Sequence, residues 1–151
     1  MAIRITDTGT LAASMDAPGT IVLLTRLAKV VHRRTTEELL GMRLRQFVLL
    51  SYLRDRQDTP QQDIQEALVL DPNNVVLLLN ELETAGLAER RRDPADRRRH
   101  VVAITAAGRR ALERAEQAQA SLEDEVLAGL SANERSTLRK LLLRALERPD
   151  G

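Results

Sequence analysis

Apolar residues recur every three or four positions along most of the chain, which is the spacing of a helix with one buried face. The stretches that carry this pattern are 18–40, 43–54, a short segment after residue 59, 71–85, 106 to about 130, and 131–146. Gly41 is suited to end the first of them. Ser131 with Glu134, and Thr59 with Gln62, form capping boxes that begin two others. The pattern predicts a mainly helical protein.

The period changes once, directly after the helix that Asp71 and Pro72 begin and Gly86 ends. Residues 87–92 and 100–105 form short strand-like runs, and the sequence DPAD between them favours a turn. A helix, a β-hairpin and a new helix follow one another in the order of a winged helix-turn-helix. The expected fold is therefore mainly α with a small β-hairpin wing, flanked by helices at both ends.

The length of 151 residues suits one domain, and one Phe, one Tyr and no Trp leave a core of Leu, Val, Ile and Ala. The net charge of +1 does not indicate a type of partner, but the charged residues are unevenly distributed along the chain. Between Arg56 and Arg90 there is no Lys or Arg, and the acidic residues there are Asp58, Asp63, Glu66, Asp71, Glu81, Glu83 and Glu89. The hairpin, in contrast, carries Arg90, Arg91, Arg92, Arg97, Arg98 and Arg99.

Six arginines on one small projection suit a phosphate backbone and a minor groove. An arginine-rich loop taken alone is as often a solvated face. Because a helix of the recognition type precedes this hairpin directly, the combination favours contact with double-stranded DNA.

The hairpin also resembles a known family. The run DPADRRR at 93–99, followed by VVAIT at 101–105 and Gly108, is similar to the wing signature of the MarR (multiple antibiotic resistance regulator) family, a D-x-R tip leading into L-T-x-x-G. The run LETAGLAER at 82–90 is similar to the family's L-E-x-x-G-L-[VI]-x-R junction. The resemblance extends over about 18–146.

The resemblance implies a domain organisation and a function. It implies a winged helix-turn-helix lobe over 43–105 and dimerisation helices over 18–40 and 106–148, with 1–17 outside it as a flexible arm. Helices near 21–31, 122–130 and 138–146 would interlock two chains; packing within one chain is the alternative. The expected protein is a homodimeric regulator of a pseudo-palindromic operator, with repression the expected sign of regulation.

Base reading is expected from the outward face of the helix over 71–85. An asparagine amide can bond an adenine edge, and an apolar side chain can contact a thymine methyl group. The residues in question are Asn73, Asn74, Val76 and Leu77. Two alternatives stay open: the asparagines can serve only as first-turn residues, and the apolar pair can belong to the core of a slightly rotated helix.

Contacts to the DNA backbone are expected from Arg54, Arg56, Gln61, Gln62, Arg90, Arg97 and Arg99. By the resemblance, Arg98 enters the minor groove and Asp96 braces it. The resemblance also implies a pocket for a small aromatic or anionic effector, with His32, Arg33 and Tyr52 as candidates. A solvated His-Arg pair and a tyrosine at the edge of the core are the alternative.

Other functions find less support. The absence of Cys excludes disulfides, and with only two His residues no zinc site is expected. There is no Gly-rich phosphate loop or G-x-S-x-G elbow, so no enzyme, cofactor or catalytic residue is expected. No 18-residue apolar run or signal pattern occurs, which predicts a cytoplasmic protein without a membrane partner. A winged helix used only for protein docking is the main rival, because its helix-turn-helix is acidic.

Overall fold

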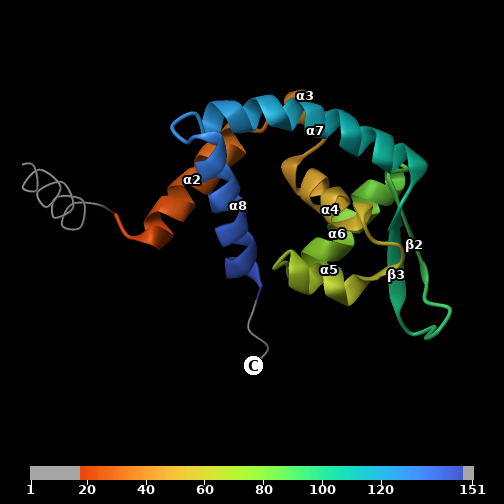
Figure 1. The fold of residues 1–151 in the computed structure, drawn as a ribbon. Coiled ribbons are helices and arrows are strands. Elements are labelled where there is room, and N and C mark those ends of the chain that lie inside the picture. The colour runs from red at the N-terminus through yellow and green to blue at the C-terminus, as the bar shows by residue number, and fades with distance from the viewer. Residues whose placement is uncertain (1–17, 148–151) are drawn as a thin grey trace, which may run out of the picture. The chain divides into compact units, whose positions relative to one another are not determined.

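The computed structural model describes residues 18–147, so the flexible arm expected over 1–17 lies outside the described residues, as does residue 148. The chain divides into two compact units, Met1–Arg34 and Thr35–Gly151. In the first unit the described element is helix α2 (Thr20–Arg34), and the second contains the helices and strands from α3 to α8 (Figure 1). Among the described residues, no helix is both long and apolar enough to cross a membrane.

The single helix predicted over 18–40 is wrong. Helix α2 ends at Arg34, and a separate short helix, α3 (Glu37–Leu40), follows. Thr36 has an extended backbone, and its hydroxyl accepts a hydrogen bond from the Leu39 N–H at 3.2 Å. This cap satisfies a backbone donor that a continuous helix would have used, so a new helix begins there. Gly41, at φ 72°, ends α3 as expected.

The helix-turn-helix consists of three helices. They are α4 (Leu44–Arg54), α5 (Gln61–Ala67) and α6 (Pro72–Thr84), the last of which is the recognition helix. Asp71 caps α6 by accepting a hydrogen bond from the Asn74 N–H at 3.0 Å, and Pro72 occupies the first helical position, as predicted. The turn between α5 and α6 passes through Val69, whose φ of 53° is unusual for a β-branched residue.

The capping box predicted for Thr59 and Gln62 is not present. Thr59 lies in a short strand, β1 (Thr59–Pro60), where it pairs with Val102 and is buried. Pro60 is the residue before α5, and it makes no side-chain cap. Pairing with a strand more than 40 residues away has replaced the local cap, and such a pairing leaves no local sequence signal.

The wing is part of a three-stranded antiparallel sheet with strand order β1-β3-β2. Strand β2 (Ala88–Arg92) pairs with β3 (His100–Ile104), from Ala88 opposite Ile104 to Arg92 opposite His100. Two backbone hydrogen bonds close the loop at the tip, Asp93 N to Arg99 O at 2.9 Å and Arg99 N to Asp96 O at 3.0 Å. The predicted hairpin is thus confirmed, with an additional strand at its base.

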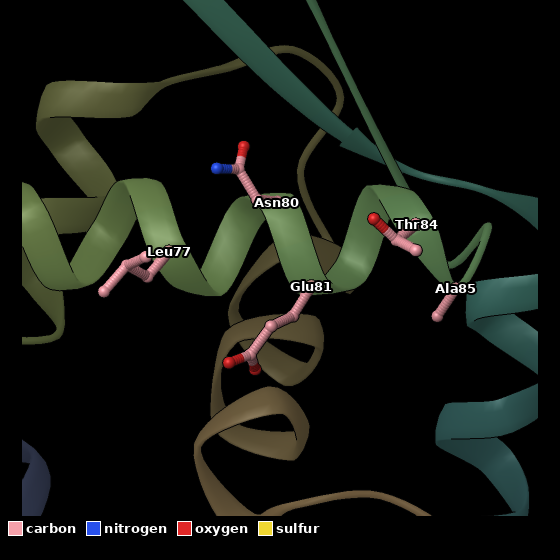
Figure 2. A pocket seen from close by; sticks show the side chains of 5 residues that line it. All are labelled: Leu77, Asn80, Glu81, Thr84 and Ala85. Atoms are coloured by element: carbon pink, nitrogen blue, oxygen red, sulfur yellow. The ribbon is translucent and has the colours of Figure 1, made fainter.

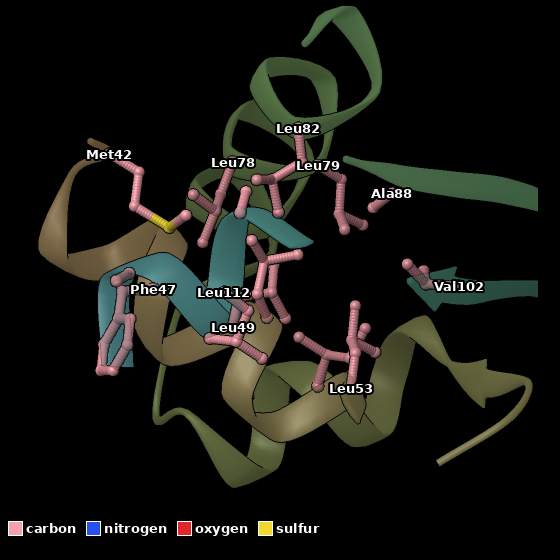
Figure 3. Close-up of a cluster of buried hydrophobic side chains, with 14 of the residues drawn as sticks. Met42, Phe47, Leu49, Leu53, Leu78, Leu79, Leu82, Ala88, Val102 and Leu112 are labelled. Atoms are coloured by element: carbon pink, nitrogen blue, oxygen red, sulfur yellow. The ribbon is translucent and has the colours of Figure 1, made fainter. Parts of the chain in front are cut away.

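One hydrophobic core holds the lobe together, and it contains side chains from α4, α6, β3 and α7 (Ala106–Val126) (Figure 3). The recognition helix buries Val75, Leu78, Leu79 and Leu82, which are the positions its helical spacing predicts. Leu112 of α7 is fully buried in the same core cluster as Leu49 and Leu53 of α4 (Figure 3). The N-terminal half of α7 therefore packs in the core of the winged helix-turn-helix lobe.

The remaining C-terminal helix begins where the sequence predicts. Helix α7 ends at Val126, four residues before the predicted end, and α8 (Ala132–Leu146) follows. The Ser131 backbone N–H donates to Glu134 Oε1 at 3.0 Å, and the Glu134 N–H donates to Ser131 Oγ at 3.2 Å. This reciprocal pair confirms the predicted capping box.

Candidate nucleic-acid interface

The outward face of α6 presents the four residues proposed to read bases. Asn73 and Asn74 are exposed in the first turn. The Asn74 side-chain amide donates a hydrogen bond to the carboxylate of Asp71, the capping residue. Asn74 is thus held at the start of α6 by the cap that begins the helix, and its base-reading role stays a prediction.

Val76 and Leu77 lie outside the core. Their exposed fractions are 38% and 58%, whereas their neighbours Val75 and Leu78 are 1% exposed. The alternative in which α6 is rotated to bury this apolar pair is therefore wrong. Two aliphatic side chains are thus exposed at the middle of the recognition helix.

A shallow hollow of about 520 Å³ continues this face toward the end of α6. It is lined by Leu77, Asn80, Glu81, Thr84 and Ala85. Figure 2 shows these side chains along one stretch of the helix, with Glu81 directed toward α4. The hollow and the exposed apolar pair form one surface, which we call the α6 face.

The carboxylate of Glu81 connects the recognition helix to the start of α4. It accepts hydrogen bonds from Arg45 at 2.8 Å, from Gln46 at 3.2 Å and from Arg43 at 3.4 Å. The side chains of Arg43 and Arg45 are both about half exposed, at 54% and 51%. The sequence gives no signal for these two cations beside the α6 face, because more than 35 residues separate them from Glu81.

Arg90 of β2 is bound to the recognition helix. Its Nε lies 3.0 Å from Glu83 Oε1 in an ion pair, and its Nη2 donates a hydrogen bond to Asn80 Oδ1 at 3.0 Å. Its side chain is only 24% exposed. The guanidinium expected to contact phosphate is therefore engaged within the protein.

The next two arginines of β2 also have partners inside the lobe. Arg91 forms ion pairs with Asp58, which precedes β1, and with Glu89 at 3.3 Å. Arg92 donates a hydrogen bond to the backbone oxygen of Arg97 at 2.7 Å. These contacts stabilise the base and the loop of the wing.

The tip of the wing has a different character. The Arg98 side chain is 95% exposed, and its Nε lies 4.0 Å from Asp96 Oδ1, the outer limit for an ion pair. Asp96 acts mainly on the backbone, because its Oδ1 accepts a hydrogen bond from the Arg98 N–H at 3.1 Å. Arg97 and Arg99 are also exposed. Three guanidinium groups thus extend from a loop that backbone hydrogen bonds hold in shape.

The expected backbone contacts near α4 and α5 are more constrained. Arg54 forms an ion pair with Glu116 of α7. Arg56 stacks on the Tyr52 ring at 3.8 Å and donates to the Tyr52 backbone oxygen at 2.6 Å. At the start of α5, Gln61 is half-buried, and Gln62 donates to Glu66 at 3.3 Å.

The candidates for an effector pocket lie in different units. His32 and Arg33 are exposed in the last turn of α2, and Tyr52 is half-buried on α4, where it holds Arg56. A pocket that joins these residues stays a prediction. Among residues 18–147, no group of three His, Asp or Glu side chains is placed to hold a metal ion.

Most of the acidic charge in the helix-turn-helix and wing has a partner within the fold. Asp71 caps α6, and the carboxylates that pair with arginines are Asp58, Glu81, Glu83 and Glu89. The negative charge that favoured a docking module in the sequence is therefore largely compensated locally. At the tip, by contrast, the Arg98 side chain is 95% exposed, and its carboxylate neighbour Asp96 lies at the outer limit for an ion pair.

Comparison with known proteins agrees with this geometry. The model of the MarR family matches residues 42–100. The uncharacterised HTH-type transcriptional regulator YdgJ of Bacillus subtilis is 34% identical over 96 residues, which are 64% of this chain and 58% of YdgJ. The chain thus spans less than two thirds of that relative's length.

Solved structures are similar over most of the chain. A probable transcriptional regulator from Pseudomonas aeruginosa has 30% identity and a TM-score of 0.68, covering 86% of this chain and 97% of its own. A mutant MarR from E. coli, complexed with operator DNA, has 27% identity and a TM-score of 0.71, covering 82% and 91%. With the family model on the lobe and these structures over the whole fold, the chain belongs to the MarR family.

Proposed function

We propose that the protein is a homodimeric, sequence-specific DNA-binding transcription regulator that recognises a pseudo-palindromic operator. The observation that carries the proposal is the contrast within the wing: Arg90 fixes β2 to the recognition helix, while Arg98 at the tip is almost fully exposed. A base that is paired with the recognition helix and an exposed cationic tip suit insertion of an arginine into a narrow minor groove. The α6 face then enters the neighbouring major groove.

Phosphates on both sides of the recognition helix have cations available to them. Arg97 and Arg99 lie on one side, at the tip, and the half-exposed Arg43 and Arg45 lie on the other, at the start of α4. A phosphate competes with Glu81 for the second pair, which makes their contribution smaller than that of the tip. Gln61, Gln62, Arg54 and Arg56 are proposed as weaker contributors, because three of these side chains already hold partners within the fold.

A second copy of the chain is proposed to cover the apolar faces of the terminal helices. Both α2 and α8 lack any buried residue in the described chain. On α8, Leu141, Leu142, Leu143 and Leu146 are between 39% and 72% exposed, and on α2 Ile21 is 75% exposed. Faces this apolar are usually covered by a partner. We assign dimerisation to 18–40 and 106–148, with 43–105 as the DNA-binding lobe.

The sign and control of regulation follow from the family resemblance alone. We propose repression, with release of DNA when a small aromatic or anionic effector binds near His32, Arg33 and Tyr52. Such control requires that the effector prefer one of two states of the dimer. The same proposal has the protein act in the cytoplasm, with its DNA target, and without cofactor or catalysis.

The experiment that tests the proposal is selection from random duplexes with the purified full-length protein, followed by affinity measurements across a salt series. We expect enrichment of an inverted repeat whose half-sites are about 10 bp apart. The logarithm of the affinity should fall linearly with the logarithm of salt concentration, because phosphate neutralisation releases counterions. No enriched sequence and no salt dependence would contradict the proposal and favour a protein-docking module.

A further inference from the structure

The recognition helix lacks the side chains that usually read guanine. Residues 72–84 include no Lys or Arg. Guanine presents two acceptors, O6 and N7, in the major groove, and a bidentate Arg or a Lys is its common partner. A helix without a cation therefore has no strong donor for the G·C pair.

The nearby arginines lie on other elements, at the start of α4 and on β2, and are paired with side chains of α6. Arg43 and Arg45 bind Glu81, and Arg90 binds Glu83 and Asn80. The same contacts occupy both carboxylates of the helix. A carboxylate is the usual acceptor for the cytosine amino group, and both carboxylates of α6 are already paired with arginines.

The α6 face does have what an A·T pair requires. Thymine carries an apolar C5 methyl group in the major groove, and adenine offers a donor and an acceptor that suit an amide. Leu77 and Val76 stand in solvent at the middle of the helix, and the exposed amide of Asn73 lies on the preceding turn. Contact with a methyl group would remove apolar surface of both partners from water.

From this chemistry, and resting on the proposed DNA binding, we infer that α6 selects A·T pairs by placing Leu77 and Val76 against thymine C5 methyl groups. The operator positions that face the middle of α6 are then A·T rather than G·C. Sequence preference in this protein arises mainly from apolar contact. The wing and the start of α4 supply affinity without reading bases in the major groove.

Replacement of thymine by deoxyuridine tests the inference directly, because uracil pairs as thymine does and lacks only the methyl group. Each thymine of the selected half-site is replaced in turn, and the affinity of the full-length protein is measured. At the contacted positions the parent should lose about fourfold per methyl group, the effect of burying one methyl-sized apolar group. Leu77→Ala should bind the thymine duplex more weakly and show a thymine-to-uracil ratio near one at its contact.

Val48→Ala is the matched control, because Val48 is also an exposed aliphatic residue but lies on α4. It should keep the parent ratio. A parent that binds every uracil duplex as tightly as thymine, or a selected site with G·C at these positions, would overturn the inference. In that case salt-dependent duplex binding would still support the proposed function. Absence of duplex binding at any salt concentration would overturn both.

Discussion

Arg90 and Glu83 join the wing to the recognition helix. The Arg90 Nε lies 3.0 Å from Glu83 Oε1, and the same guanidinium donates a hydrogen bond to Asn80, one turn earlier on α6. Both side chains are partly buried, at 24% and 35% exposure. One planar group thus contacts α6 twice, by an ion pair with Glu83 and a hydrogen bond to Asn80, and we propose that Arg90 positions β2 rather than binding phosphate.

Arg90→Ala should lower the free energy of unfolding by roughly 1 to 3 kcal/mol, since a charge-assisted contact with a partly buried carboxylate is lost. Operator affinity should also fall, while the salt slope stays close to that of the parent. Arg90→Lys should restore neither the stability nor the operator affinity, because an ammonium group cannot contact Glu83 and Asn80 together as the planar guanidinium does. Chemical denaturation and a salt series measure both. Arg99→Ala, which removes a proposed phosphate contact, is the comparison. A salt slope that falls as much in Arg90→Ala as in Arg99→Ala would show that Arg90 contacts phosphate.

Gly108 allows α7 to begin against the base of the wing. A Cβ at this position would lie 2.0 Å from the backbone oxygen of Leu87 and 2.8 Å from Ile104 Cγ1. Gly108→Ala should therefore destabilise the lobe by roughly 1 to 3 kcal/mol, the usual effect of overpacking. Gly129→Ala is the control, because nothing lies within 4 Å of its added Cβ. Equal melting temperatures for the two variants would show that Leu87 and Ile104 can move away from the added Cβ with little loss of stability.

Leu142→Glu combined with Leu146→Glu should convert the dimer to a monomer at micromolar concentration, because charges would face the proposed partner. Sedimentation equilibrium measures the mass. Operator affinity should fall steeply as well, since a single lobe loses the linked second half-site. Val69→Glu, which changes an apolar residue that is 76% exposed in the turn before α6, should leave the dimer intact. A double variant that stays dimeric would place the interface elsewhere.

The helicity of the first turn of α8 should depend on pH. The pKa of the Glu134 carboxyl lies below its ordinary value, because the backbone N–H of Ser131 and then its side chain bond to the carboxylate. A pKa lowered by folding stabilises the helix above the unfolded value of about 4.3, and this stabilisation is lost as pH falls through the folded value. The NMR Cα shifts of 132–135 should therefore become less helical below that pH. Glu134→Gln should remove this dependence, and identical profiles for parent and variant would contradict the assignment.

The sequence predicts best where a local signal decides the structure. Asp71 and Pro72 begin α6, and Ser131 with Glu134 begins α8, because a cap involves neighbours in the chain. The inward set of α6 follows from spacing alone. The wing follows from its turn residues and the change of period.

Prediction fails where a distant or competing contact decides. Thr59 looks like a helix cap but pairs with Val102, and the pattern of 18–40 hides the break that Thr36 makes. Distant contacts also determine which arginines of the wing are paired and which are exposed. Charge alone marks Arg90 and Arg98 equally, and only the fold shows that Glu83 pairs with a partly buried Arg90 while the Arg98 side chain is 95% exposed at the tip.

Insertion of the wing-tip arginine into the minor groove is tested by the affinity of Arg98→Ala for the selected operator across a salt series. Binding to the selected operator should weaken by roughly 1 to 3 kcal/mol, and the salt slope should fall by about one per wing. The dimer and its melting temperature should not change, because the Arg98 side chain is 95% exposed. Asp96→Ala should show a smaller loss, and Arg110→Ala, an exposed arginine on α7, should show little. Affinity of Arg98→Ala within about twofold of the parent, with an unchanged salt slope, would contradict insertion of Arg98 into the minor groove.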